Sequence, residues 1–280
     1  MEVLVGTSGY SYPDWVGGFY PAGTRPDKML SYYGRHFPLV ELNFTFYRPP
    51  TPEMLDKIAA RTPPGFQFLV KLPRTVSHER SPKDIDGFRR AVHGLRSRGQ
   101  LSGLLCQLPQ SVHDDRPSRT WVETVGRGLG DLHLAVEFRH RSWAGPETAA
   151  WLSELGLGLV AVDVPDLPGL YPRGWVRAGP SAYVRFHSRN KANWYLGDKE
   201  RYDFHYDDAA LNEWIDAASA AAAAGTTERA LFLFNNCFRS QAADNARRMM
   251  GLMAGRPGLH VEPPPGGTPP AQRSLFDDAP

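Results

Sequence analysis

Eight short apolar segments recur along the chain, and each ends on its C-terminal side in a polar or charged residue. They lie at residues 3–8, 39–43, 66–71, 104–107, 134–137, 159–163, 182–187 and 230–236. Most are followed by a segment of helical character before the next one begins. Eight buried strands alternating with helices predict an α/β fold, a single parallel (β/α)8 barrel of the TIM type, whose polar strand ends meet at one mouth.

The competing fold is a doubly wound open sheet. Such a sheet commonly carries a glycine-rich phosphate loop after its first strand. Here the first strand runs into Thr7 and Ser8, and no loop of that pattern follows. The length of 280 residues also suits a barrel, which typically needs about 250. The barrel is therefore the predicted fold.

Helix starts are predicted where a capping residue precedes a proline, at Thr51 and at Ser81. Asp207 or Asp208 is expected to cap a later helix, and a last helix is expected over residues 240–254. These segments stand between the predicted strands, where the outer layer of a barrel requires helices.

Two regions depart from the regular alternation. The sixth repeat is irregular, because no helical segment follows its strand before Ala182. From Gly255 onward the chain is rich in proline and glycine and cannot pack a core. The predicted organisation is a barrel domain at residues 1–254 and a flexible tail at residues 255–280.

The composition restricts the cell compartment and the class of partner. The formal charge of +2 is too small to indicate a nucleic-acid partner unless the charges are clustered. The two cysteines, Cys106 and Cys237, cannot build a disulfide framework and lack metal-site spacing, which favours a reducing cytoplasm. No apolar run approaches the roughly 20 residues of a membrane helix, so no membrane partner is expected.

Side chains alternate along a strand, so sequence parity indicates which residues share the inner face. With the valine-rich face turned toward the helices, the residues predicted to point into the lumen are Glu41, Asn43, Lys71, Glu137, Asp163, Arg185 and His187. Buried charges are costly unless they are paired or used. Glu137 is expected to pair with Arg185, and Lys71 with Glu41 or Asp163. The alternative interpretation is a purely structural lattice of ion pairs filling the barrel.

His187 is the predicted acid–base residue, because imidazole titrates nearest to neutral pH and a carboxylate across the lumen could tune it. Glu137 is its predicted partner or an independent base, and Asp163 completes the predicted catalytic set. His78 is more simply interpreted as a loop residue. No cofactor is predicted. A divalent metal is conceivable on Glu41, Glu137, Asp163 and His187, but no tight ligand spacing occurs, so no metal site is predicted.

Cations and aromatic residues follow the strands at the predicted mouth. Arginine forks suit phosphate oxygens, and aromatic faces suit bases or sugar rings, although loop aromatics equally often only pack the rim. The predicted ligand is an anion with a flat or cyclic part, such as a phosphorylated sugar or a nucleotide. The residues predicted to bind it are Lys71, Arg139, Arg185, Arg189, Asn43, Asn235, Asn236, Tyr12, Trp15 and Tyr47.

Several segments together resemble the YecE-like family, a bacterial and archaeal domain of unknown function. They are GTSGYSYPDW at 6–15, ELNFTFY at 41–47, TPPGF at 62–66, EFR at 137–139, RFHSRN at 185–190 and FNN at 234–236. The resemblance spans roughly residues 3 to 253. It implies a TIM barrel and no established reaction. This chain has Tyr10 where the family tends to have Trp, and Ser188 and Ser240 where it tends to have Gly.

The tail carries a candidate partner motif. Gln272, Ser274, Leu275 and Phe276, with one variable residue after the glutamine, are similar to the pentapeptide by which bacterial proteins dock on the DNA-polymerase sliding clamp. That resemblance implies that Leu275 and Phe276 insert into an apolar groove while Gln272 makes polar contacts. A chance match, or packing of these two side chains on the barrel itself, is the alternative.

Three functional hypotheses follow from these features. The leading one is a cytoplasmic TIM-barrel enzyme of DNA metabolism that hydrolyses a nucleotide or nucleic-acid substrate at phosphorus or at a glycosidic carbon. The second is an isomerase or hydrolase of sugar phosphates with an incidental tail. The third is a non-catalytic module that binds nucleic-acid ends at the barrel mouth.

Overall fold

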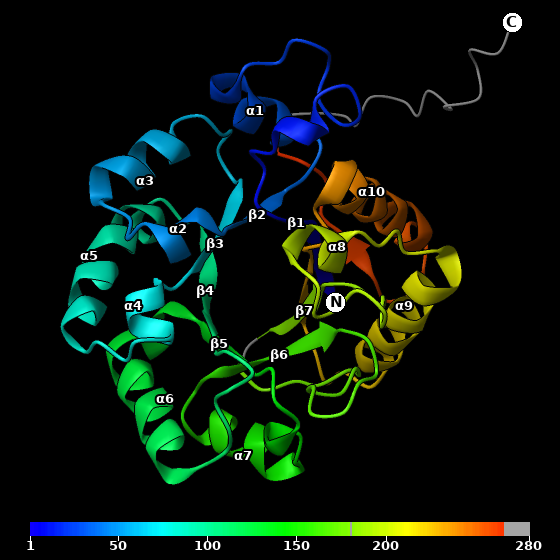
Figure 1. Ribbon diagram of the computed structural model, residues 1–280. Coiled ribbons are helices and arrows are strands. Elements are labelled where there is room, and N and C mark those ends of the chain that lie inside the picture. Colours follow the sequence, from blue (N-terminus) through cyan, green and yellow to red (C-terminus); the bar gives the residue numbers. More distant parts are fainter. Residues whose placement is uncertain (180, 266–280) are drawn as a thin grey trace, which may run out of the picture.

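The computed structural model describes residues 1–179 and 181–265 (Figure 1). Its strands are β1 (Glu2–Ser8), β2 (Leu39–Leu42), β3 (Gln67–Lys71), β4 (Leu101–Gln107), β5 (Leu134–Glu137), β6 (Gly158–Asp163), β7 (Ala182–Phe186), β8 (Arg229–Phe234) and β9 (His260–Val261). The first eight pair in parallel in chain order, and β1 pairs with both β8 and β2, which closes the ring. The predicted (β/α)8 barrel is confirmed.

Helices surround the barrel, and Figure 1 shows them as an outer ring around the strands. The α-helices are α1 (Pro26–Tyr33), α2 (Phe44–Tyr47), α3 (Pro52–Ala59), α4 (Arg74–Ser77), α5 (Lys83–Ser97), α6 (Arg116–Leu129), α7 (Pro146–Glu154), α8 (Asp198–Tyr202), α9 (Asp208–Ala223) and α10 (Gln241–Met253). The 3-10 turns are η1 (Pro13–Trp15), η2 (Gly130–Leu132), η3 (Arg141–Trp143) and η4 (Phe238–Ser240).

The strands are apolar on both faces because helices cover one face and side chains fill the lumen on the other. On the outside, α5 buries Ile85, Phe88 and Val92 from a single face of the helix. On the inside, Leu69 and Leu231 line a small cavity in the lower part of the barrel. Ser102, His133 and Tyr183 also line this cavity, so the lower lumen has both apolar and polar walls.

Two of the predicted helix caps are present. Thr51 Oγ1 accepts a hydrogen bond from the Met54 amide at the start of α3. Asp207 Oδ1 accepts one from the Ala210 amide, at 2.8 Å, at the start of α9. The predicted cap at Ser81 is wrong: Pro82 takes the cap position of α5, and the Ser81 hydroxyl has no hydrogen-bond partner within the described residues.

The irregular sixth repeat is confirmed, because β6 leads to β7 through residues 164–179 without a helix. Ordered structure continues past residue 254, the predicted end of the barrel domain. Beyond it, β9 pairs with the first residues of β1, and the Glu262 amide donates to the Val3 carbonyl at 2.9 Å. The clamp-like residues 272–276 lie outside the described part of the chain. Within the described ranges, no helix is long and apolar enough to cross a membrane.

Candidate functional site

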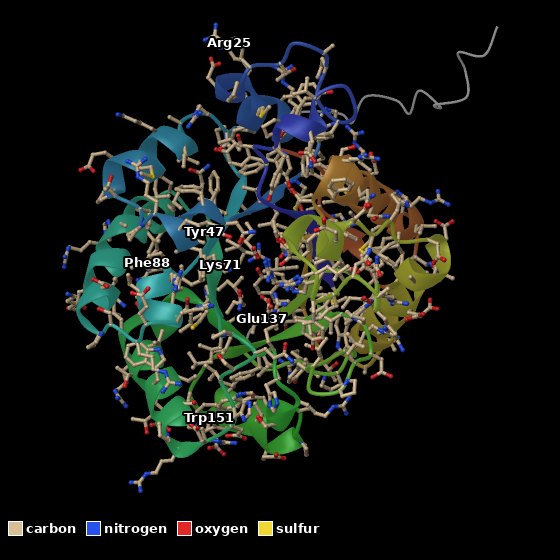
Figure 2. The ribbon with its side chains drawn as sticks, in the orientation of Figure 1. Arg25, Tyr47, Lys71, Phe88, Glu137 and Trp151 are labelled. Carbon is tan, nitrogen blue, oxygen red and sulfur yellow. The ribbon has the colours of Figure 1, made fainter. Side chains whose placement is uncertain are left out.

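The register of the strands determines which side chains share the lumen. Residues paired across neighbouring parallel strands point to the same side of the sheet. The polar residues turned inward near the C-terminal end are Ser8, Glu41, Lys71, Gln107, Glu137, Arg185 and Asn235. Figure 2 shows Lys71 and Glu137 near the centre of the barrel, whereas Trp151 lies out in the helical layer. Six of the charged or titratable residues here, Glu41, Lys71, Glu137, Arg139, Arg185 and His187, are called the mouth cluster below.

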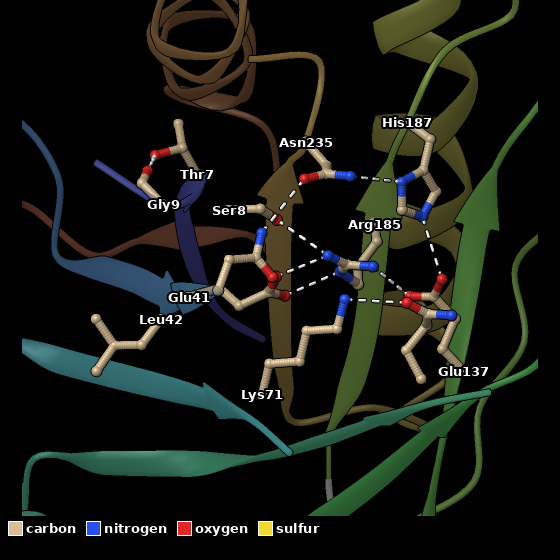
Figure 3. Close-up of polar contacts among 12 residues, drawn as sticks. Thr7, Ser8, Gly9, Glu41, Leu42, Lys71, Glu137, Arg185, His187 and Asn235 are labelled. Atoms are coloured by element: carbon tan, nitrogen blue, oxygen red, sulfur yellow. Dashed lines mark hydrogen bonds and ion pairs between the residues drawn. The ribbon is translucent and has the colours of Figure 1, made fainter. Parts of the chain in front are cut away.

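Arg185 is the hub of the mouth cluster and is almost fully buried. Its Nε and Nη2 atoms donate to the two carboxylate oxygens of Glu41 at 2.8 and 2.7 Å. Its Nη1 atom donates to Glu137 Oε2 at 2.6 Å, and Nη2 also reaches Ser8 Oγ at 3.3 Å (Figure 3). The Tyr183 hydroxyl donates to Glu41 from the same strand as Arg185. This guanidinium is therefore fully committed to protein groups.

Glu137 at the end of β5 is fully buried and contacts three residues. It accepts hydrogen bonds from Arg139 and Arg185, and it lies beside His187. Burial alone would raise the pKa of this carboxyl group, but the positive charges of Arg139 and Arg185 hold it well below its usual value. Glu137 is thus a permanent carboxylate. The predicted pair of Glu137 and Arg185 is confirmed.

His187 lies just beyond β7 and is fully buried. Its Nδ1 atom is 3.0 Å from the Asn235 amide nitrogen, an arrangement in which Nδ1 accepts and Nε2 carries the proton. Nε2 is 3.3 Å from Glu137 Oε1, but it lacks hydrogen-bond geometry and has no partner within the described residues. Burial, together with the charge of Arg139, lowers the pKa of His187 to about 3. The imidazole is therefore neutral and keeps an unused N–H.

Lys71, the last residue of β3, has a different environment. Its ammonium donates to Gln107 Oε1 at 3.0 Å and lies 4.5 Å from the centre of the Phe46 ring. No carboxylate of the described residues lies within ion-pair distance of it, so the expected pairing with Glu41 or Asp163 is wrong. Burial, reinforced by the charge of Arg185, lowers the pKa of Lys71 to about 8.

The cluster has a closed lower layer and an upper layer that solvent reaches. Glu41, Glu137 and His187 have no exposed surface. By contrast, Lys71 is half-buried, and the Arg139 side chain keeps 11% of its surface exposed. Arg139 donates to Glu137 through Nε, and its terminal nitrogens make no hydrogen bond with the described part of the chain. Lys71 and Arg139 are therefore the cations that an arriving ligand meets.

Asp163 does not belong to the cluster, which corrects the position predicted for it. In the register, Val162 pairs beside Arg185, so Val162 faces the lumen and Asp163 faces outward. There it accepts hydrogen bonds from Arg189 and from Trp214 Nε1 of α9. The inward-facing residues of β6 are Gly158, Val160 and Val162. Because Gly158 has no side chain, the sequence does not reveal which face of this strand points inward.

Arg189 is not placed to bind a ligand at the mouth, because it pairs with Asp163 on the outer side of the barrel. Its guanidinium is shared between Asp163 and Glu213 of α9, at 2.7 and 2.8 Å. These ion pairs fasten the segment after β7 to α9 on the outer side of the barrel. Within the described residues, the side-chain hydrogen bonds of Arg189 go to Asp163, Glu213 and the Ala210 carbonyl, and none goes to the mouth cluster.

The predicted asparagines divide in the same way. Asn43 Nδ2 is 3.5 Å from Asn235 Oδ1 at the mouth, and the buried Asn43 Oδ1 has no partner among the described residues. Asn236 points outward, where its amide donates to the Phe204 carbonyl and to Asn245 Oδ1. Asn43 and Asn235 therefore lie at the candidate site, and Asn236 holds neighbouring elements together.

The predicted aromatic residues have three different positions. Trp15 is fully buried, and its Nε1 donates to the Cys237 carbonyl at 2.7 Å, which ties the loop after β1 to the chain after β8. Tyr12 donates to the Ser8 carbonyl at 2.6 Å and packs on Trp15. Tyr47, at the end of α2, is 80% exposed on the rim. Of these three described residues, Tyr47 is the one placed to contact a large ligand from outside.

A metal site is not apparent in the part of the chain described, where no three His, Cys, Asp or Glu side chains are grouped to hold an ion. Glu41, Tyr183 and Gln107 also belong to the site, although they are not among the predicted catalytic and binding residues. The alternation of side chains along a strand indicates Glu41 and Tyr183, because they share a strand face with Asn43 and Arg185 respectively. Gln107 is the polar end of β4 and could have been included on that ground.

These features define a TIM barrel with a preformed polar site at its C-terminal mouth. The chain belongs to the DUF72 family, since residues 4–269 match the family described as "Protein of unknown function DUF72". The family resemblance read from the sequence motifs is confirmed.

Relatives of known sequence agree with this assignment. The chain is 28% identical over 272 residues to the UPF0759 protein YunF of Bacillus subtilis (strain 168), covering 90% of this chain and 94% of that protein. It is 32% identical over 142 residues to the UPF0759 protein YecE of Escherichia coli (strain K12), covering 49% of this chain and 48% of that protein.

Solved structures show the same architecture. A DUF72 family protein from Thermotoga maritima MSB8 superposes with a TM-score of 0.83 at 34% identity, covering 91% of this chain and all of that one. A DUF72 family protein from Enterococcus faecalis V583 superposes with a TM-score of 0.79 at 23% identity, covering 90% and 95% of the two chains. The second likeness concerns the fold alone.

Proposed function

We propose that the protein is an enzyme that acts on a phosphate-bearing sugar, free or as part of a nucleotide or nucleic acid, at the C-terminal mouth of the barrel. The observation that carries this proposal is the charge balance of the mouth cluster. Three cations, Lys71, Arg139 and Arg185, face two carboxylates. With His187 neutral, the cluster holds one positive charge in excess, and a partly buried excess charge favours an anionic ligand.

Arg139 and Lys71 bind the phosphate. Arg185 donates its hydrogen bonds to the two glutamates, and Arg189 is paired on the outer side, so neither has a free donor directed at a ligand. The terminal nitrogens of Arg139 suit two phosphate oxygens, and the Lys71 ammonium supplies a second charge. Asn43 Oδ1 and His187 Nε2, both without partners in the described structure, offer an acceptor and a donor to sugar hydroxyl groups.

The chemistry is acid–base catalysis, with hydrolysis as the reaction class. Lys71 is the group of the mouth cluster that changes protonation near neutral pH, because its pKa is about 8. Glu137 stays a carboxylate and orients Arg139. His187 stays neutral and donates a hydrogen bond through Nε2. The proton-transfer role that the sequence assigned to His187 thus passes to Lys71.

Calorimetric titration with ribose 5-phosphate and with ribose tests the proposal. The phosphorylated sugar is expected to bind and the plain sugar to bind far more weakly. Arg139→Met should weaken binding of ribose 5-phosphate by roughly 10- to 100-fold, the effect of removing a charge-assisted contact of about 1.5–3 kcal/mol. Arg141→Met, at an exposed cation on the same loop, is the matched control. Equal affinities for the two sugars would refute the proposal.

A role in DNA metabolism rests on the tail motif and on the rim. The exposed Tyr47 ring offers a stacking surface beside a cationic site, as proteins that bind single strands use. Residues 272–276 supply the proposed contact with the sliding clamp. A peptide covering residues 268–280 should bind purified clamp, and the double variant Leu275→Ala with Phe276→Ala should not. Absence of binding by the unaltered peptide would leave the small sugar phosphate as the substrate class.

A non-catalytic module that binds nucleic-acid ends is the second candidate. It is favoured because Glu41, Glu137 and Arg185 are bonded to one another and leave few groups free for proton transfer. It predicts affinity for oligonucleotides without turnover of any phosphorylated sugar. Retained oligonucleotide binding by Lys71→Arg, together with no activity of the unaltered protein on nucleotide or sugar-phosphate panels, would support it.

A further inference from the structure

Within the described residues, the cation of the mouth cluster without an ion-pair partner is Lys71, one of the chain's few lysines. The sequence contains 26 arginines and 6 lysines, which together make the 32 cationic residues. Lys28, Lys57, Lys83 and Lys191 are exposed on the surface, whereas Lys71 lies half-buried at the end of β3. An arginine at this position would supply charge alone, because a guanidinium does not deprotonate in proteins. A lysine can also present a neutral amine.

The surroundings of Lys71 are those of an activated amine. Burial and the charges of Arg185 and Arg139 lower the pKa of Lys71 and outweigh the opposite effect of Glu41 and Glu137. No carboxylate in the described ranges lies within ion-pair distance of its ammonium. Phe46 covers one side of the ammonium, and Gln107 accepts a single hydrogen bond. Lysines that attack carbonyl groups are activated by this combination of desolvation and nearby positive charge. Figure 3 shows the Lys71 amine directed into the middle of the cluster rather than toward the helices.

We infer that Lys71 forms an imine with the free carbonyl group of a phosphorylated sugar, held by its phosphate at Arg139. The inference rests on the proposed function and names the reactive carbon of that substrate. The neutral amine of Lys71 attacks the carbonyl carbon, and one of its two protons passes to the carbonyl oxygen to give a carbinolamine. The hydroxyl group then takes a proton from solvent and leaves as water, while the nitrogen lone pair forms the C=N bond of a protonated imine. No oxidant or reductant is consumed.

The polar groups around Lys71 fit these proton movements. The buried Nε2–H of His187 has no partner in the described structure, and it meets the carbonyl oxygen when the substrate enters the closed layer beneath Lys71. Glu137 lies beside that N–H and stays negatively charged, so it stabilises the positive charge of a protonated imine. The phosphate site and the amine belong to the solvent-reached layer of the cluster, so a sugar can contact both.

Reductive trapping tests the inference. The intact protein is treated with glyceraldehyde 3-phosphate and cyanoborohydride at pH 8, digested and analysed by mass spectrometry. About half of Lys71 is neutral at this pH, against well under one per cent of an exposed lysine, so Lys71 should react roughly 100-fold faster than Lys28 or Lys57. The labelled peptide gains the mass of the aldehyde less one oxygen atom. Labelling spread evenly over the exposed lysines would overturn the inference.

Three variants distinguish the reactivity of the Lys71 amine from the effect of its positive charge. Lys71→Arg keeps the charge and should bind inorganic phosphate but give no adduct. Lys57→Met, on the surface of α3, should leave trapping unchanged. Arg139→Met should reduce trapping of glyceraldehyde 3-phosphate but not of unphosphorylated glyceraldehyde. Phosphate binding that depends on Arg139, without any adduct at Lys71, would refute the imine and leave the proposed function standing. Loss of both would refute both.

The carbonyl sugar could be a free sugar phosphate or part of a nucleic-acid strand, and a second test substrate distinguishes the two. An oligonucleotide with one abasic site carries an aldehyde next to phosphates within a strand. Trapping of this strand in preference to glyceraldehyde 3-phosphate identifies a nucleic-acid substrate, and the reverse preference identifies a free sugar phosphate. Failure to trap either one at Lys71 contradicts the inference.

Discussion

Arg185 on β7 donates two hydrogen bonds, at 2.8 and 2.7 Å, to the two carboxylate oxygens of Glu41 on β2, and it does so across the lumen of the barrel. The same guanidinium reaches Glu137 on β5 at 2.6 Å. One side chain therefore joins three strands that are far apart in the sequence. The charge of Arg185 is balanced by the two glutamates. Arg185 therefore fixes the carboxylates of Glu41 and Glu137 beneath Lys71 and Arg139.

Arg185→Met is expected to destabilise the protein by about 3–5 kcal/mol, because it leaves two buried carboxylates without their shared cation. The free energy of unfolding can be measured by urea denaturation at pH 7. Arg25→Met removes an exposed ion pair with Asp27 and should cost less than about 1 kcal/mol. Equal effects of the two changes would mean that Arg185 is not the structural hub.

Asp163→Asn tests the outward position of this carboxylate. The change weakens the bonds from Arg189, Tyr206 and Trp214 and should destabilise the protein by about 2–4 kcal/mol. Affinity for ribose 5-phosphate, measured by calorimetry on the folded fraction, should stay within about two-fold. A large loss of affinity with unchanged stability would return Asp163 to the candidate site.

His187 is expected to remain neutral at pH 5. Its folded pKa is about 3, because of burial and the charge of Arg139, against an ordinary value of 6.5. The unfolded chain binds a proton below pH 6.5 and the folded chain does not, so this residue makes the protein lose stability as the pH falls from 6.5 toward 3. Nitrogen NMR shifts should show a neutral His187 ring with the proton on Nε2. A charged His187 at pH 5 would contradict this.

Lys71→Met should stabilise the protein at pH 7. The folded pKa of Lys71 is about 8 against an ordinary 10.5, so holding the ammonium in the mouth costs up to about 3 kcal/mol. The expected gain is about 1–3 kcal/mol, since the bond to Gln107 is lost at the same time. The gain should shrink as the pH rises from 8 to 10.5, where both states release the proton. Lys57→Met is the control, and a destabilised Lys71→Met variant would argue against the lowered pKa.

The barrel could be predicted from the sequence because eight apolar runs of strand length leave few other arrangements. Glu137, Arg185 and His187 could be predicted to meet because β5 and β7 have unambiguous alternation. Prediction failed on β6, where Gly158, Val160 and Val162 face inward. Apart from Asp163 at its end, both faces of that strand carry only apolar residues, so parity alone does not distinguish them.

The protonation states could not be predicted from residue types. His187 was favoured for proton transfer because of its ordinary pKa, but burial and the charge of Arg139 make it a permanent neutral donor. Lys71 was assigned a partner that it does not have, since Arg185 takes both oxygens of Glu41. Such assignments depend on three-dimensional competition for the same carboxylates, which a sequence does not reveal. Ser240 adopts a left-handed backbone conformation with φ 63°, which its residue type alone does not predict either.

The pH dependence of affinity for ribose 5-phosphate tests the central claim most directly, because Lys71 is the cation at the mouth that loses its charge near pH 8. Calorimetry from pH 7 to pH 9.5 should show affinity falling above pH 8 in the unaltered protein and staying level in Lys71→Arg. If affinity is independent of pH in both proteins, or falls equally in both, then Lys71 does not hold the ligand and the proposed site is wrong.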